Sequence, residues 1–156
     1  MVFRPEAAPK TRDTFITWFH KQTEWVNDRN YNDLSDTSSE LSDWFLEMIK
    51  TFPTLNGPFA TDDIDNPKNA DYSIGKDFIY VGFAWSVLEE AHDKAVELAK
   101  KYGVGFFECS ADDGDIMFPQ NGWLIPIDSP SKSYTDYTYT VTTYTRKKKP
   151  WWKFWG

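Results

Sequence analysis

Cysteine is almost absent from this sequence of 156 residues, in which Cys109 is the one example. A single cysteine excludes an intramolecular disulfide, and with it a small secreted fold held together by disulfides. Residues 1–20 contain no continuous apolar run, and no stretch approaches the roughly 20 apolar residues that span a bilayer. We therefore expect a cytoplasmic protein with no signal peptide and no stable membrane insertion.

The common catalytic and cofactor-binding motifs are missing as well. The sequence contains no GxGxxG, P-loop, HExxH or GxSxG pattern, and no Cys/His cluster with zinc spacing. The two histidines, His20 and His92, both fall on charged parts of predicted helices. Cys109 falls in an apolar strand, where a cysteine more often packs than acts as a nucleophile. We expect no enzymatic activity, no cofactor and no metal site.

Negative charge and aromatic side chains are in excess. The net charge is −7, but the last part of the chain, residues 146–156, holds five basic residues and no acidic ones. Residues 1–145 therefore contain 24 acidic and 12 basic residues, a net charge of −12. Such a surface repels nucleic acid and attracts basic partners with fast, salt-sensitive association. Aromatic residues make up 18 % of the chain, which favours a core built from rings and leaves a surplus for partner-binding surfaces.

This division of charge predicts one domain over residues 1–145 and a separate tail over residues 146–156. The length fits a single domain with a single core. The tail, RKKKPWWKFWG, combines basic side chains with rings that favour interfaces. Three roles stay open for it: folding back on the acidic domain, contact with a partner, or weak contact with an anionic membrane surface. The sequence gives no indication of the oligomeric state.

Three helices are predicted from apolar residues that repeat at three- and four-residue spacing. The first runs from about residue 10 to residue 27. The other two each begin at a predicted capping box and end at a helix-breaking residue. These signals are Thr37 with Glu40 and then Pro53 for the second helix, and Ser86 with Glu89 and then Gly103 for the third.

Strand-forming residues occur in six short segments. They are residues 2–3, 72–74, 78–84, 104–109, 115–118 and 134–146. Residues 119–133 contain three prolines and are expected to form a connection, with Trp123, Leu124 and Ile125 reaching into the core. We predict an α+β domain: a mixed or antiparallel sheet of four to six strands with three helices, the two N-terminal helices lying beside or over the sheet.

Two aspartate clusters are the candidate functional residues. Their members are Asp62, Asp63 and Asp65 in a long loop over residues 53–77, and Asp112, Asp113 and Asp115 in a predicted turn. A solvated loop or turn explains both clusters without a function, because aspartate is a common turn residue. A metal site lacks the spacing of an EF-hand loop, and carboxylate catalysis lacks a companion His or Lys. The functional interpretation of the two clusters is electrostatic contact with a protein partner.

Several segments together resemble a family of small uncharacterised bacterial proteins. These segments are PEAAPKTRDTFITWFHKQTEW, NGPFATDDID, DYSIG and GVGFFECSADDGDIMFP, within residues 5–119. Small acidic proteins of this kind, some with a lysine and tryptophan tail, resemble immunity proteins that neutralise toxins of contact-dependent or type VI inhibition systems. This chain departs from the family at its start, where the first strand is cut to Val2 and Phe3. No active-site residue is carried over.

The resemblance implies an immunity-type binding protein whose partner is a cognate toxin domain. The acidic domain and the aspartate clusters fit such a protein, which would cover the basic active-site surface of the toxin. The alternative is a small carboxylate-based enzyme or ligand-binding protein of unknown substrate. That alternative predicts a concave site in which Asp or Glu side chains converge under the loop at residues 53–77.

Overall fold

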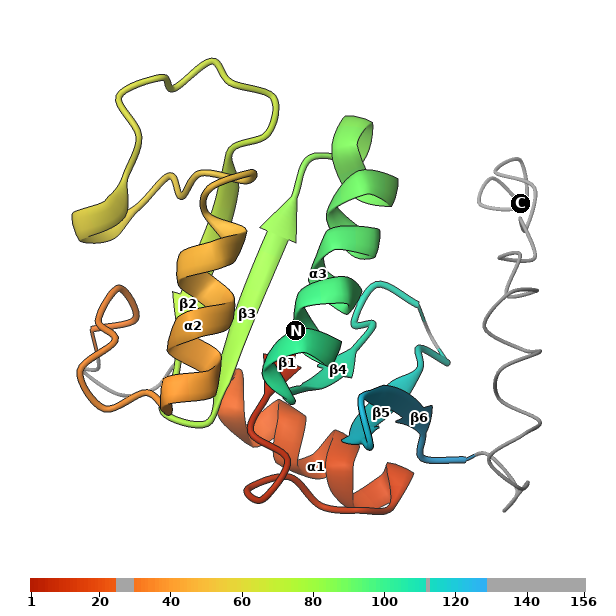
Figure 1. Cartoon of the computed structure of the whole chain (residues 1–156). Coiled ribbons are helices and arrows are strands. Elements are labelled where there is room, and N and C mark those ends of the chain that lie inside the picture. The colour runs from red at the N-terminus through yellow and green to blue at the C-terminus, as the bar shows by residue number, and fades with distance from the viewer. Residues whose placement is uncertain (25–29, 112, 129–156) are drawn as a thin grey trace, which may run out of the picture.

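The computed structural model describes residues 1–24, 30–111 and 113–128, and its centre is an antiparallel sheet of six strands (Figure 1). The strands are β1 (Val2–Phe3), β2 (Ala70–Ile74), β3 (Phe78–Phe83), β4 (Gly105–Phe107), β5 (Ile116–Gln120) and β6 (Trp123–Pro126). The helices are α1 (Arg12–Gln22), α2 (Ser39–Met48) and α3 (Leu88–Tyr102), with short 3₁₀ turns at Gly57–Phe59 and Trp85–Val87. The sheet order is β2-β3-β1-β4-β5-β6, so the predicted α+β class is confirmed and the sheet is antiparallel throughout.

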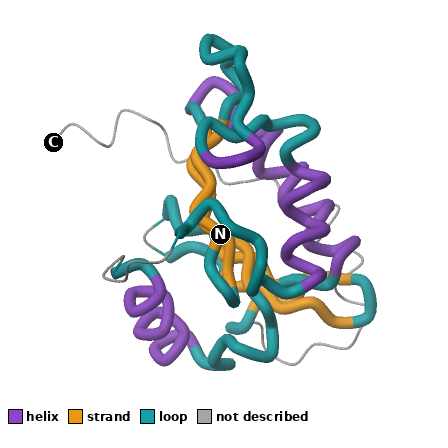
Figure 2. The backbone as a smooth tube through the Cα atoms, turned by 90° about the vertical axis from the view of Figure 1, so that its left-hand side faces the viewer, coloured by secondary structure: helices purple, strands orange, loops and turns teal. Residues whose placement is uncertain are grey.

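The sheet is the middle of three layers. Figure 2 shows α1 on one face and the pair α2 and α3 on the other. Successive side chains of a strand point to opposite faces. Val2 accordingly belongs to the core under α2 and α3, while Phe3 belongs to the core under α1. Both cores are rich in rings, as the composition predicts.

The two-residue strand β1 lies at the centre of the sheet. Val2 pairs with Ile79 of β3 on one side and with Phe106 of β4 on the other. Both side chains of β1 are fully buried, because helices cover both faces of the sheet at this point. The short first strand is confirmed, and it joins the two halves of the sheet.

The apolar stripe of α2 is buried as predicted, but the helix begins at a different cap. Leu41, Trp44, Phe45 and Met48 are all buried. The capping residue is Ser38, whose hydroxyl accepts a hydrogen bond from the Leu41 N–H at 3.4 Å. The predicted cap, Thr37, instead donates from its hydroxyl to the Gly75 carbonyl at 3.0 Å.

The start of α3 also differs from the prediction, while its end agrees. Ser86 lies inside a 3₁₀ turn, and the helix begins after Val87 with no side-chain cap. The capping box of Ser86 and Glu89 is therefore wrong. Gly103 ends the helix with φ of 69°, in the left-handed region that glycine adopts easily.

The last hairpin replaces part of the connection expected over residues 119–133. Asn121 and Gly122 both have positive φ and form a two-residue turn between Gln120 and Trp123. Pro119 is tolerated inside β5 because β4 pairs only with the first two residues of that strand, so no ladder bond is lost. The predicted strand at 134–146 and the predicted tail at 146–156 lie outside the described residues.

Gly105 and Gly82 form a matched pair for a stability test. A Cβ at Gly105 would stand 2.2 Å from the ring of Phe3, whereas a Cβ at Gly82 would meet nothing within 4 Å. We expect Gly105→Ala to lower the free energy of unfolding by about 1–3 kcal/mol through overpacking. Gly82→Ala should change it by no more than about 0.5 kcal/mol. Urea denaturation of both variants checks this, and equal effects would contradict the packing at Gly105.

Candidate functional site

The first aspartate cluster stands on the loop that leads into β2. Asp62, Asp63 and Asp65 are all exposed. Asn69 anchors the loop: it is buried, and its side-chain amide donates a hydrogen bond to the Asp63 carbonyl at 2.7 Å. Thr61 N–H also donates to the Thr54 carbonyl at 3.1 Å. The carboxylates therefore project from a loop with ordered anchors.

The second cluster lies in the turn between β4 and β5. Asp113 is exposed and Asp115 is half-buried, while Asp112 lies outside the described residues. The turn is tight: a Cβ at Gly114 would stand 1.8 Å from the Glu108 carbonyl oxygen. The Arg12 guanidinium donates to the Gly114 carbonyl at 3.2 Å. This segment therefore acts as a turn between the two strands, one of the two readings given by the sequence.

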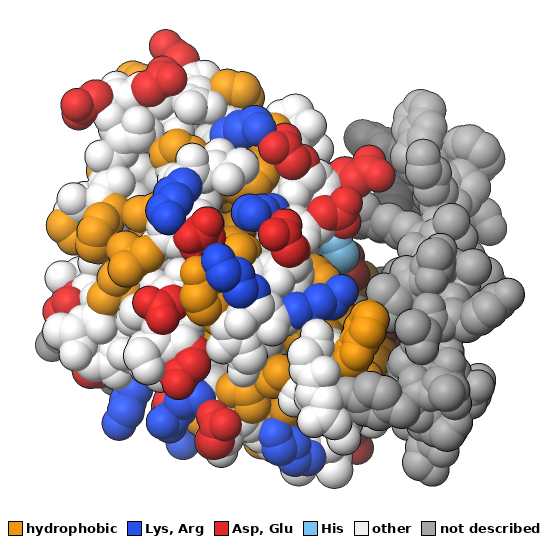
Figure 3. All heavy atoms as spheres, viewed as in Figure 1, with side chains coloured by type: hydrophobic (Ala, Val, Ile, Leu, Met, Phe, Trp, Pro, Cys, Tyr) orange, Lys and Arg blue, Asp and Glu red, His pale blue; other side chains and the backbone are white. Residues whose placement is uncertain are grey.

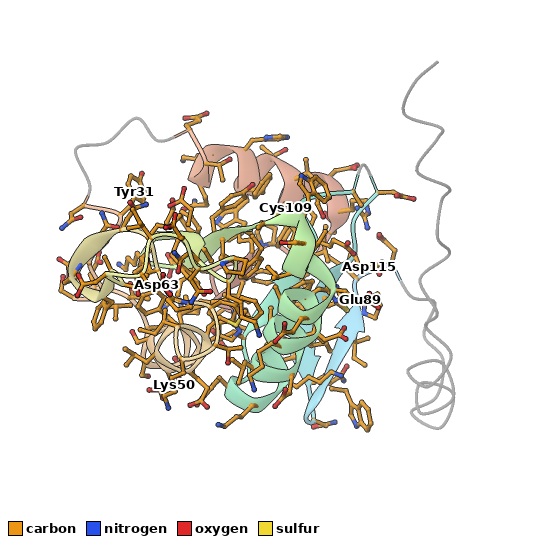
Figure 4. The ribbon with its side chains drawn as sticks, turned by 90° about the horizontal axis from the view of Figure 1, so that it is seen from above. Tyr31, Lys50, Asp63, Glu89, Cys109 and Asp115 are labelled. Carbon is orange, nitrogen blue, oxygen red and sulfur yellow. The ribbon has the colours of Figure 1, made fainter. Side chains whose placement is uncertain are left out.

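The structure does not bring the two clusters together. The loop with Asp63 enters the sheet at β2, whereas the turn with Asp115 joins β4 to β5, and β3 and β1 lie between them. At about 4.8 Å per strand, β2 and β4 are about 14 Å apart across the sheet. Asp63 and Asp115 accordingly stand on different sides of the molecule viewed from above (Figure 4). The five described aspartates, Asp62, Asp63, Asp65, Asp113 and Asp115, therefore do not form a single site.

The neighbour of the Asp62–Asp65 loop is the start of α3. Lys68 of the loop forms an ion pair with Glu90 at 2.5 Å, which ties the two segments together. The reason is the β2–β3 hairpin, in which Ala70 pairs with Phe83, so that the loop before β2 and the helix after β3 share one end of the sheet. We call this surface the acidic end. Its members are Asp62, Asp63 and Asp65 of the loop and Glu90 of α3, the partner of Lys68.

Figure 3 shows acidic side chains at the top of the molecule, over this loop and the upper end of α3. Among the acidic residues of α3, Glu89 and Glu90 also favour the helix by facing its partial positive charge, which gives them a structural reason to be there. The three aspartates of the loop lie among turns, where aspartate is a common residue. The acidic end therefore gathers charge from two segments that each have a structural reason for it.

Two large apolar side chains are exposed at the same end. Trp85, in the 3₁₀ turn between β3 and α3, is 85 % exposed, and Ile64, between the loop aspartates, is 77 % exposed. Exposed tryptophan is uncommon, because burying such a ring stabilises a protein by more than almost any other side chain. An exposed tryptophan ring is typical of protein-binding surfaces. Sequence reasoning gave no role to either residue.

A cleft opens beside Trp85, between β3 and β4. Its volume is about 210 Å³. It exists because β1 pairs only with the first two residues of β3, so that the rest of β3 has no strand on that side among the described residues. We call this cleft the strand gap. Its lining includes Tyr80, Val81, Phe83, Trp85, Leu88, His92, Phe106, Glu108 and Cys109.

The polar groups in the strand gap do not form a catalytic arrangement. Cys109 is half-buried, and its thiol donates to the Phe107 carbonyl at 3.5 Å rather than to His92. The His92 ring packs edge-on against Phe106, with centroids 5.4 Å apart. Burial raises the pKa of Tyr80, and the nearby Cys109 raises it further. Glu108 is the one carboxylate in the lining, so the converging carboxylates of the alternative function are not found in the gap.

No group of three or more His, Cys, Asp or Glu side chains in the described parts of the chain has the geometry to hold a metal ion. Within residues 1–24, 30–111 and 113–128, no helix has both the length and the apolar character needed to cross a bilayer. No protein-family model, curated protein or solved structure matches the chain. The resemblance to immunity proteins therefore stays a prediction from the sequence.

Proposed function

We propose that this chain is an immunity-type binding protein that acts in the cytoplasm and neutralises a cognate bacterial toxin by covering its basic active-site surface. The observations that carry the proposal are the acidic end and the exposed ring of Trp85 in the turn that leads into α3. An interface of this kind uses a large ring as its anchor and charge to select and steer the partner. Of the predicted site residues, the proposal keeps Asp62, Asp63 and Asp65.

Support comes from the charge of the domain as well as from its distribution. Toxins that act on nucleic acids or nucleotides need basic active sites, and an acidic protein can occupy such a site in place of the substrate. Lys68 is the basic residue tied to the acidic end, and it is already paired with Glu90. The net charge available to a partner at this end is therefore strongly negative. Asp113 and Asp115 lie elsewhere and are not part of the proposed interface.

The proposal is tested with the protein encoded next to this gene, purified with and without the present chain. We expect a stable complex whose association rate falls as salt rises from low to physiological concentration, because exposed charges are screened over about 8–10 Å. No complex, or an association rate that ignores salt, would contradict the proposal. A toxin that remains active inside the complex would contradict the covering of its active site.

A triple variant distinguishes the effect of the acidic end on the association rate from the effect of the overall net charge. We expect Asp62→Asn, Asp63→Asn and Asp65→Asn together to slow association about 10-fold at low salt, because they remove steering charge at the interface. The matched control is Glu6→Gln, Asp13→Asn and Glu24→Gln, three exposed carboxylates around α1 at the other end of the molecule. Stopped-flow association measures both, and equal slowing would show that only the net charge matters.

A further inference from the structure

We draw no further inference here: the strongest candidate, a cation site at the aspartate cluster of the loop that the buried Asn69 anchors before β2, carries nothing, because its carboxylates belong to the acidic end already described and, in the described parts of the chain, no three acidic, histidine or cysteine side chains are placed to hold a metal ion.

Discussion

Trp44→Ala is expected to lower the free energy of unfolding by about 3–5 kcal/mol. The Trp44 side chain is 0 % exposed in the core between α2, α3 and the sheet, and its indole N–H donates to the Ala95 carbonyl of α3 at 3.1 Å. Removing it leaves a large cavity at the contact between two helices. Domains of this size have a total stability of about 5–15 kcal/mol, so the variant loses a large share of it.

Trp44→Phe separates the ring from its hydrogen bond. Phenylalanine keeps most of the buried apolar area but cannot donate to Ala95, so we expect a loss of about 1–3 kcal/mol. Chemical denaturation followed by circular dichroism measures both variants. The control is Trp85→Ala, the same truncation at a ring that is 85 % exposed, which should change stability by no more than about 0.5 kcal/mol. Similar losses at positions 44 and 85 would contradict the burial of Trp44.

The sequence predicts those parts of the fold that depend on local patterns. The stripe of α2 and the glycine end of α3 follow from apolar spacing and from the conformational freedom of glycine, and both are found. The hairpin at Asn121 and Gly122 also had a strong local signal, since Asn-Gly is the preferred pair for a two-residue turn. The prolines around it led to the wrong prediction of an irregular connection. The backbone nitrogen atoms of these prolines lie on the sides of the hairpin strands where no neighbouring strand needs a hydrogen bond from them.

The helix caps depend on contacts that the local sequence does not contain. The segment Thr37–Glu40 offers three hydroxyls, and a tertiary hydrogen bond from Thr37 to Gly75 leaves Ser38 as the cap. For α3, the chain leaving β3 forms a 3₁₀ turn first, which moves Ser86 away from the capping position. A local motif cannot decide between such alternatives when neighbouring strands compete for the same hydroxyl.

The sequence selected both aspartate clusters as candidate residues, and no observation tests their role. The described members of the two clusters lie apart in the sheet. The sequence did contain a signal for the element that lies next to the loop. A hairpin over residues 70–83 places the loop that precedes it beside the helix that follows it. The exposure of Trp85 had no signal in the sequence. An aromatic residue next to an apolar strand is usually buried, and only the turn after β3 directs this ring to solvent.

If the chain binds a toxin as proposed, Trp85→Ala is expected to weaken that binding by about 2 kcal/mol or more, roughly 30-fold, with little effect on folding. A ring that is 85 % exposed in the free protein has most of its surface left to bury in a complex. The loss should appear mainly as faster dissociation, because the side chain is uncharged and makes short-range contacts. The aspartate variants should instead slow association.

The matched control is Leu46→Ala, which truncates an exposed apolar side chain on the outer face of α2 and should leave affinity unchanged. Trp85→Phe should recover part of the loss, because it restores a ring at the same position. Surface plasmon resonance of the four proteins gives both rate constants. If Trp85→Ala binds as tightly as Leu46→Ala, the anchor of the proposed interface lies elsewhere, and the acidic end contributes by charge alone.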